Sequence, residues 1–192
     1  MKIILASKSP RRKELLSLIT KDFEVIVSSS DEVVDTSLTP FEQVKEIANQ
    51  KAEDVFAGCE GNCIVIGSDT IVVSRSGEIL GKPKDADDAK RMLRMLSNDF
   101  HQVMTGITVI IRKDDKIEKY IECDVASVHI NELSDVEIDR WLVTGNAWDK
   151  AGAYAVQQEF GVHIDKIDGS YATVIGLPVH TVYQILKKYM FD

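Results

Sequence analysis

The sequence predicts an α/β fold, with a mixed, twisted sheet flanked by helices and splayed into two lobes. Short β-like runs alternate with amphipathic helical stretches along the 192 residues. Two long β segments near the middle are separated only by a short polar turn, so they form a hairpin and the sheet cannot be wholly parallel. The chain is long enough for one large domain or two small lobes.

The first elements follow from local signals. Ile3–Ala6 is a short apolar strand, and a helix begins after it, with Ser9 as N-cap and Pro10 in the first turn. Glu24–Val27 is a second strand. Thr39–Glu42 is a capping box that opens the next helix, whose apolar positions share one face.

The rest of the chain continues the alternation. Cys63–Ile66 is an apolar strand, and Thr70–Val73 resumes one after a polar break. A capping box at Ser134–Glu137 predicts another helix start. The remaining predicted elements are a helix over Asp85–Leu96, β segments over Val103–Ile111 and Glu118–Ile130 with a turn at Lys113–Lys116, a helix to about Val143, and a terminal helix over Pro178–Tyr189.

Charge and composition exclude several classes of protein. The net charge is −8, from 23 basic and 31 acidic residues, which argues against binding long nucleic acid. No apolar run approaches the roughly 18 residues of a membrane helix, and no signal peptide is visible. Three cysteines without a secretion signal predict reduced thiols and a cytoplasmic location.

The N-terminus departs from this acidic average, because five basic residues precede Glu14. Arg11 and Arg12 fall in the first turn of the predicted helix, where the helix dipole disfavours cations. One interpretation is a phosphate-sized receptor built from backbone N–H groups, Ser7, Ser9 and the basic side chains. The other is a solvated basic helix end.

Several polar residues interrupt apolar runs. Asp69 lies between two strongly apolar stretches, so it must cap a turn, pair with a cation or bind a metal. Asp31 and Glu32 follow a strand end, where α/β folds place chemistry, although by themselves they fit a solvated loop better than a metal site. Lys82 lies in a Gly-Lys-Pro turn, and Lys51 by itself is an ordinary surface lysine.

Together these motifs resemble the Maf family over residues 2 to about 180. The resemblance is carried by Ser7-x-Ser9-Pro10-Arg11-Arg12-x-Glu14-Leu15-Leu16, Asp31-Glu32, Gly67-Ser68-Asp69-Thr70, Gly81-Lys82-Pro83, Thr105-Gly106, Asp149 to Tyr154, Gly169-Ser170-Tyr171 and Gly176-Leu177-Pro178. The resemblance implies a single Maf-like domain over residues 1–192. It also implies an inosine-triphosphatase-like fold of the Maf/HAM1 type, with two lobes and a central cleft.

The resemblance implies a nucleoside triphosphate pyrophosphatase, which hydrolyses a nucleotide substrate to the monophosphate and pyrophosphate. By that resemblance Asp69 is the catalytic proton acceptor and Glu32 its partner, and both hold a divalent cation, Mg²⁺, Mn²⁺ or Co²⁺. Lys51 and Lys82 complete the catalytic set. The resemblance leaves open whether the chain forms a homodimer.

The substrate-binding positions implied are Ser7, Arg11, Arg12, Thr70 and Gln157. Arg11, Thr70 and Gln157 match the branch that acts on dTTP and UTP, and a glutamine amide can pair with the donor and acceptor of uracil or thymine. Gln158 competes for this role, but strand alternation would point the two side chains to opposite faces. The rival functions are a nucleotide-binding regulator of cell division and a phosphatase for inosine-type purines.

Overall fold

The structure, a computed structural model, describes residues 1–29 and 32–190. The chain forms two compact units, both assembled from segments that are distant in sequence. Unit 1 comprises Met1–Asp69, Thr105–Asp124 and Gly176–Asp192, and unit 2 comprises Thr70–Met104 and Val125–Ile175.

The helices and strands alternate as the sequence predicts. The elements of unit 1 are β1 (Lys2–Leu5), α1 (Pro10–Leu16), β2 (Glu24–Val25), α2 (Pro40–Ala57) and α6 (Val179–Met190). Three long strands contribute residues to both units: β3 (Cys63–Val73), β5 (Asp99–Lys113) and β6 (Lys116–Ile130). Those of unit 2 are β4 (Ile79–Leu80), α3 (Ala86–Leu96), α4 (Asp135–Val143), the 3₁₀ helices η1 (Ala151–Ala153) and η2 (Glu159–His163), β7 (Ile164–Asp168) and α5 (Tyr171–Ile175).

The strands form one seven-stranded sheet in the order β2-β1-β3-β5-β6-β7, with β4 paired to β3. β1 runs parallel to both β2 and β3, whereas β4 on β3 and β7 on β6 are antiparallel. Asp114 and Asp115 both have positive φ angles, of 50° and 62°, as a two-residue turn between long strands requires. The predicted mixed sheet is therefore confirmed.

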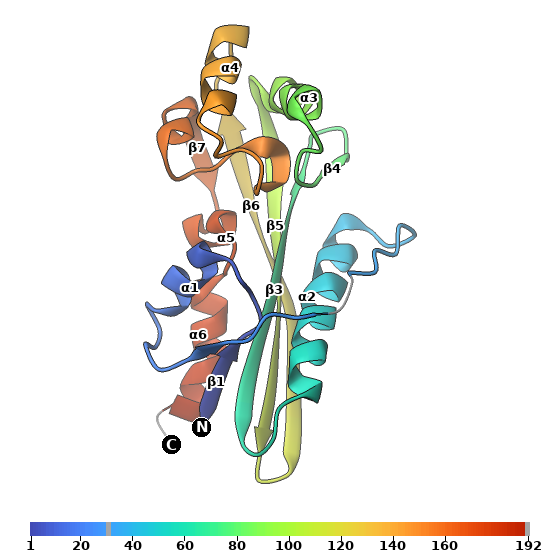
Figure 1. Cartoon of the computed structure of the whole chain (residues 1–192), viewed down its shortest axis with the longest axis vertical. Helices are drawn as coiled ribbons and strands as arrows, with labels where there is room; N and C mark the ends of the chain where they lie inside the picture. Colours follow the sequence, from blue (N-terminus) through green and yellow to red (C-terminus); the bar gives the residue numbers. More distant parts are fainter. Residues whose placement is uncertain (30–31, 191–192) are drawn as a thin grey trace. The chain divides into compact units, whose positions relative to one another are not determined.

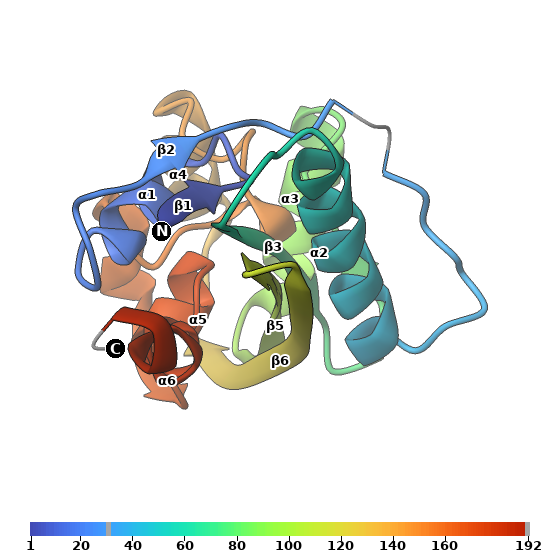
Figure 2. The same cartoon turned by 90° about the horizontal axis from the view of Figure 1, so that it is seen from below.

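In unit 1, α2 and α6 lie on opposite sides of the strands (Figures 1 and 2). α2 approaches unusually closely because two glycines face it. A Cβ on Gly67 would lie 2.4 Å from the carbonyl oxygen of Ala48, and one on Gly106 would lie 2.4 Å from that of Val44. The helix backbone thus rests against the strand backbone at two points, which fixes its position along the strands.

The core of unit 2 forms where α3 packs against α4 and η1. Its largest members include Trp141, Tyr154 and Phe160, whose rings lie within about 5.5 Å of one another in the pairs Trp141–Phe160 and Tyr154–Phe160. The indole N–H of Trp141 donates to the carbonyl oxygen of Ala153 at 2.8 Å. This bond ties η1 to α4, so the segment that follows η1 begins from a fixed point.

The structure corrects some predicted boundaries. β3 is one continuous strand through Gly67–Asp69, so the predicted polar break in it is wrong. The polar residues are tolerated within the strand because Gly67 has no side chain to bury and both Ser68 and Asp69 have partners. Val103–Ile111 and Glu118–Ile130 prove to be parts of longer strands, and β2 ends at Val25 rather than Val27. The short elements β4, β7 and α5 were not predicted, because too few residues carry their pattern.

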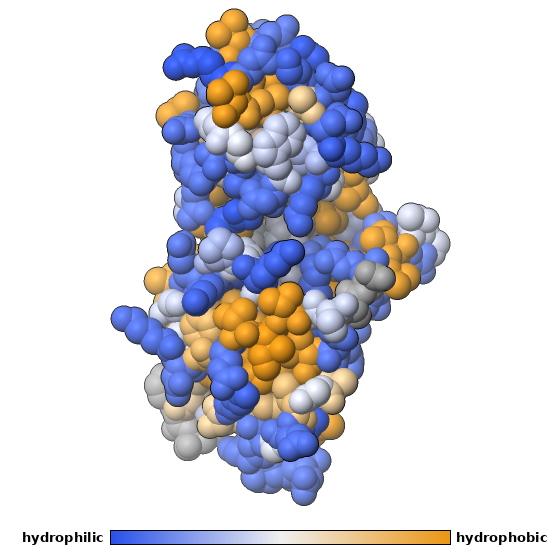
Figure 3. All heavy atoms as spheres, in the orientation of Figure 1, coloured by the Kyte–Doolittle hydropathy of each residue, from blue (hydrophilic) through white to orange (hydrophobic). Residues whose placement is uncertain are grey.

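The face that Figure 3 shows is largely hydrophilic and is interrupted by apolar patches. Val25, Ile26 and Val27, at and after the edge strand β2, are among the exposed large apolar residues. Within residues 1–29 and 32–190, no helix combines the length and the apolar character that crossing a membrane requires.

Candidate active site

The loop between β1 and α1 has the predicted helix start. Ser9 is the N-cap, its hydroxyl accepts from the backbone N–H of Arg12 at 3.5 Å, and Pro10 occupies the first turn. The backbone N–H of Ser9 donates in turn to the hydroxyl of Ser7 at 3.3 Å. Ser7 is buried, so its hydroxyl is held at the base of the loop rather than in solvent.

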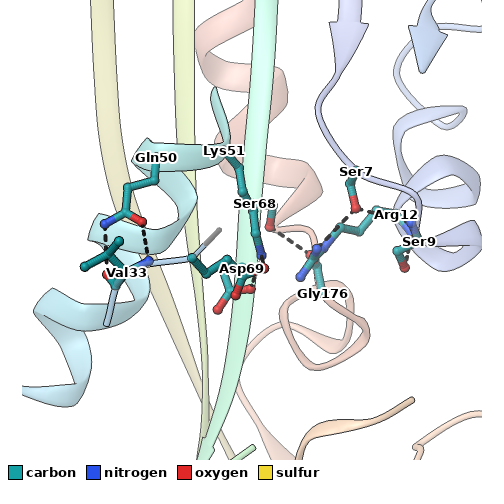
Figure 4. Close-up of polar contacts among 10 residues, drawn as sticks. Ser7, Ser9, Arg12, Val33, Gln50, Lys51, Ser68, Asp69 and Gly176 are labelled. Carbon is teal, nitrogen blue, oxygen red and sulfur yellow. Dashed lines mark hydrogen bonds and ion pairs between the residues drawn. The ribbon is translucent and has the colours of Figure 1, made fainter. Parts of the chain in front are cut away.

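Arg12 links this loop to the residues before α6 (Figure 4). Its Nε donates to the carbonyl oxygen of Gly176 at 2.8 Å, and its Nη1 donates to the hydroxyl of Ser7 at 3.2 Å. The hydroxyl of Ser68, on β3, donates to the same carbonyl at 3.0 Å. Gly176 has a φ of 125°, a conformation that side-chain-bearing residues rarely adopt.

The electrostatics of this corner favour an anion. Burial lowers the pKa of the Arg12 guanidinium below its ordinary value, and the like charge of Arg11 lowers it further. The carboxylates of Asp69 and Glu32 act in the opposite direction. A guanidinium that is shielded from water and lies near a second cation is stabilised when an anion binds beside it.

Lys51, on α2, lies between the two predicted catalytic acids. Its Nζ is 2.6 Å from Oδ1 of Asp69 and 3.0 Å from Oε1 of Glu32 (Figure 4). The Lys51 and Asp69 side chains are only 15% and 18% exposed, whereas that of Glu32 is 54% exposed. Two carboxylates therefore surround one point of positive charge at the surface of unit 1.

The packing of α2 on β3 explains why Lys51 reaches Asp69. Gly67 rests against Ala48 and Ala52, one helical turn apart, and Lys51 is the neighbour of Ala52 on that helix. Side chains two residues apart on a strand point to the same face, so Asp69 projects toward α2 as Gly67 does. Asp69 and Lys51 thus meet because Gly67 has no side chain that would keep α2 away from β3.

Glu32 reaches Lys51 from a segment without helix or strand, residues 32–35. Gln50, the residue before Lys51 on α2, holds Val33, the residue after Glu32, through both backbone polar groups at 3.0 Å each. Asp31, which was also predicted near the site, lies outside the described residues.

The remaining predicted site residues belong to unit 2. Thr70 follows Asp69 directly on β3. Lys82 is exposed next to the buried Pro83, and the preceding Gly81 accepts a backbone hydrogen bond at 3.0 Å from Gly152, in η1. This bond holds the backbone before Lys82, which lies in a bend, and the predicted direction of the Lys82 side chain stays a prediction.

Gln157 lies in a bend of unit 2 between η1 and η2, and its neighbour Gln158 has a φ of 72°. The prediction that strand alternation separates these two side chains is wrong, because the segment is not a strand. The two residues still differ in environment. Gln157 is half-buried and Gln158 is exposed, which leaves Gln157 as the candidate for base recognition.

A divalent cation fits the donor set of Glu32 and Asp69. Among residues 1–29 and 32–190, no three or more His, Cys, Asp or Glu side chains form a complete metal cage. Mg²⁺ in phosphate-processing sites commonly takes only one or two carboxylates, and the phosphates and water supply the rest. The two acids around Lys51 match that requirement.

The sequence did not identify the contacts that hold Arg12. Ser68 and Gly176 belong to recognised motifs, but the hydrogen bond from Arg12 to Gly176 joins residues 164 positions apart. The role of Gln50 was also missed, since an isolated glutamine on a helix carries no signal of a backbone contact. Only Gly176-Leu177-Pro178, a turn before a helix, could have indicated a constrained backbone.

Comparison with known proteins gives consistent matches. The family model described as "Maf-like protein" matches residues 2–189. A protein of Lachnoclostridium phytofermentans named dTTP/UTP pyrophosphatase is 44% identical over 191 residues, 99% of this chain and 96% of that protein. One of Alkaliphilus oremlandii with the same name is 45% identical over 99% of this chain and 96% of its own.

A HAM1 protein from Coxiella burnetii has a similar solved structure, with a TM-score of 0.53. The match covers 98% of this chain and 99% of that protein, at 14% sequence identity. At this identity the likeness concerns the fold, and it confirms the predicted α/β architecture of the HAM1 type.

Proposed function

Since the chain belongs to the Maf-like protein family, we propose that it is a nucleoside triphosphate pyrophosphatase that hydrolyses dTTP and UTP to the monophosphate and pyrophosphate. The structural observation that carries the proposal is the arrangement of Glu32 and Asp69 around Lys51. It combines a proton acceptor, a second acid and a cation at one point, which hydrolysis of a phosphoric anhydride requires.

Asp69 is the proposed proton acceptor. Asp69 directly follows the buried stretch Cys63–Ser68 of β3, and its carboxylate is held by Lys51 at 2.6 Å, so its orientation is fixed before substrate arrives. A water molecule attacking the α-phosphorus must lose a proton, and a carboxylate within hydrogen-bond reach can accept it. Bond cleavage then releases pyrophosphate.

The basic residues would stabilise the negative charge of the triphosphate. Arg12 is oriented by Gly176 and Ser7, so this side chain needs little reorganisation when the phosphates bind. Lys82 would add its charge from the exposed segment beside Pro83. Lys51 would share its charge between the two acids and the phosphates, since an ammonium group can donate in three directions.

Glu32 and Asp69 are the residues that would hold a divalent cation, Mg²⁺, Mn²⁺ or Co²⁺. When bound, the ion supplies positive charge that offsets the charge of the phosphates. Neither carboxylate is sequestered in the core, and Glu32 is more than half exposed. Both acids could therefore give up their contact with Lys51 and bind a metal ion instead.

Gln157 would recognise the base, and Arg11 and Thr70 would contribute to the same recognition. Uracil and thymine present an acceptor and a donor side by side, which one amide group can satisfy together. Cytosine replaces the acceptor at the 4-position with a donor amine, so the amide N–H₂ would face a second donor.

A turnover screen with separation of products tests the proposal. The purified chain, with each of the three cations, is incubated with dTTP, UTP, CTP, GTP, ATP and ITP. We expect monophosphate and pyrophosphate from dTTP and UTP. Turnover of ITP alone would contradict the substrate, release of orthophosphate would contradict the reaction, and binding without turnover would support the rival function, a regulator.

The proposal includes a cytoplasmic location, which the three free thiols Cys59, Cys63 and Cys123 support. Formation of a homodimer stays a prediction, which sedimentation equilibrium would test.

A further inference from the structure

The position of Glu32 needs a specific explanation, because its surroundings provide little packing. Residues 32–37 are all exposed, and residues 32–35 belong to no helix or strand. Burial of apolar side chains therefore contributes little to holding this segment, and the exposed side chain of Val33 is an example. A catalytic carboxylate placed on such a segment must be held by polar contacts.

Gln50 makes the contacts that replace packing. Its Oε1 accepts from the backbone N–H of Val33, and its Nε2 donates to the carbonyl oxygen of Val33, both at 3.0 Å (Figure 4). One amide thus pairs with both polar groups of one residue, as a neighbouring strand would. The pair fixes the position and the direction of the backbone at residue 33.

A third hydrogen bond orients the amide itself. Nε2 of Gln50 also donates to Oε1 of Glu46 at 3.2 Å, one turn earlier on α2. The oxygen and the two N–H bonds of the amide therefore all have partners. A flipped amide would set its N–H₂ group against the N–H of Val33 and its oxygen against the oxygens of Val33 and Glu46. The side chain is held in the one orientation that fits Val33.

The two hydrogen bonds between Gln50 and Val33 lie next to the ion pair between Lys51 and Glu32. Val33 follows Glu32, and Gln50 precedes Lys51, so adjacent residues of α2 hold the backbone and the carboxylate. On the other side of Glu32, the backbone N–H of Ser29 donates to Asp54, also on α2, at 2.8 Å. Helix α2 therefore holds the chain at both Ser29 and Val33.

We propose that Gln50 is a positioning residue that holds Glu32 in the active site by clamping the backbone of Val33. The role rests on the proposed function, because it acts through the second acid of the pyrophosphatase reaction. The hydrogen bonds of Gln50 go to Val33 and Glu46, so its effect on Glu32 is exerted through the backbone of the next residue. It acts before substrate binds, by removing conformational freedom from a segment that would otherwise move.

Gln50→Leu is the direct test, because leucine keeps the approximate size and removes all three hydrogen bonds. We expect kcat for dTTP to fall at least tenfold, while KM changes less than threefold, since the proposed phosphate contacts come from other residues. Independently of activity, the backbone N–H of Val33 in the substrate-free protein should exchange with deuterium at least tenfold faster. The melting temperature should stay close to that of the wild type.

Gln43→Leu is the matched control. Gln43 lies on the same helix, and its amide donates to the carbonyl oxygen of Leu38 at 2.8 Å, at the far end of the same loop. The change removes an equivalent side-chain bond to the loop without touching Glu32 or its neighbour. We expect kcat within twofold of the wild type and unchanged exchange at Val33.

Two results would overturn the inference. One is a Gln50→Leu enzyme with wild-type kcat, and the other is an equal loss of kcat in Gln50→Leu and Gln43→Leu. If the wild-type protein itself hydrolyses neither dTTP nor UTP, the proposed function fails instead, and the exchange measurement still reports whether Gln50 clamps Val33.

Discussion

At the scale of single residues, polar contacts hold the charged side chains of the candidate site. Lys51 meets two carboxylates, and Arg12 meets a hydroxyl and a carbonyl oxygen. Each of these side chains is held before any ligand arrives. Substitutions there should therefore separate effects on chemistry, on binding and on folding.

Asp69→Asn should lower kcat for dTTP on the order of 10²–10⁴-fold, because an amide cannot accept the proton of the attacking water. Folding should change little, since Lys51 retains its contact with Glu32. Steady-state kinetics and a thermal melt check both statements. Glu53→Gln, which alters an exposed acid paired with Lys119 on the same unit, is the control and should leave kcat unchanged. A variant at residue 69 with near wild-type kcat would remove Asp69 from the mechanism.

Arg12→Lys should raise KM for dTTP about tenfold and lower the melting temperature. An ammonium group keeps the charge but cannot donate to Gly176 and Ser7 as the planar guanidinium does. Each lost hydrogen bond contributes roughly 1 kcal/mol, or about 2–4 °C in a chain of this size. Lys13→Ala, an exposed change in the same helix, should alter neither quantity. An unchanged melting temperature would mean that the contacts of Arg12 serve binding alone.

At the scale of elements, the contact between α2 and β3 places Asp69 and Lys51 together. Gly67 makes that contact possible, because its missing side chain lets two backbones meet. In unit 2, a hydrogen bond between β5 and the segment after η1 holds these two elements together. There, Nε2 of His101 lies 2.7 Å from the hydroxyl of Tyr154 in the core.

Gly67→Ala should destabilise the fold by about 1–3 kcal/mol and lower activity as well. The new Cβ would lie 2.4 Å from the carbonyl oxygen of Ala48, so α2 must shift and carry Lys51 away from Asp69. Denaturant unfolding and kcat measure the two effects. Gly58→Ala, where the nearest atom is 3.7 Å away, should be nearly neutral in both. Wild-type stability of the Gly67 variant would show that the helix can shift without loss.

His101 should make the stability of the chain fall in mild acid. Burial lowers its pKa to about 4, so the unfolded chain, with an ordinary pKa near 6.5, binds the proton first. The contribution of neutral, buried His101 to the free energy of unfolding is complete above pH 6.5. It is lost as the pH falls toward 4, by roughly 3 kcal/mol in total. Unfolding free energies between pH 7 and 4.5 measure this slope.

The matched variant for this slope is His101→Gln. It can still pair with Tyr154 and does not titrate, so its stability should depend less on pH over this range. Equal slopes for the two proteins would mean that His101 is not the group responsible.

At the scale of the whole molecule, the candidate residues divide between two units. The acids, Lys51 and the arginines belong to unit 1, whereas Thr70, Lys82 and Gln157 belong to unit 2. β3, β5 and β6 contribute residues to both units, so the two groups are joined by continuous strands. Each unit therefore supplies candidate residues for the phosphates and for the base, Arg12 and Arg11 from unit 1 and Lys82 and Gln157 from unit 2.

Gln157→Glu should reduce kcat/KM for UTP far more than for CTP, because the carboxylate loses the donor that pairs with the 4-oxygen of uracil. The wild-type preference should be roughly ten- to hundredfold, equivalent to 1–3 kcal/mol for an unmade buried pair. Gln158→Ala should leave the UTP/CTP ratio nearly unchanged, since that side chain is exposed. The opposite pattern in these two variants would move base recognition to Gln158.

The sequence by itself determined the alternation of helices and strands, the mixed sheet and the identity of the candidate residues. These depend on local causes, such as the capping boxes at Thr39 and Ser134, the proline after Ser9 and the apolar periodicity of α2. Charged and polar residues in apolar strands, Asp69 above all, also stand out locally, because burying them without partners is costly.

Only the tertiary structure decided which residues meet. Ser68 and Arg12 both donate to Gly176, and Lys51 joins Glu32 to Asp69, through contacts between segments that no local pattern relates. The continuity of β3 through its polar residues, and the bend at Gln157 where a strand was expected, have the same origin. Their conformations depend on partners distant in sequence, so the energy that selects them exists only once the chain has folded.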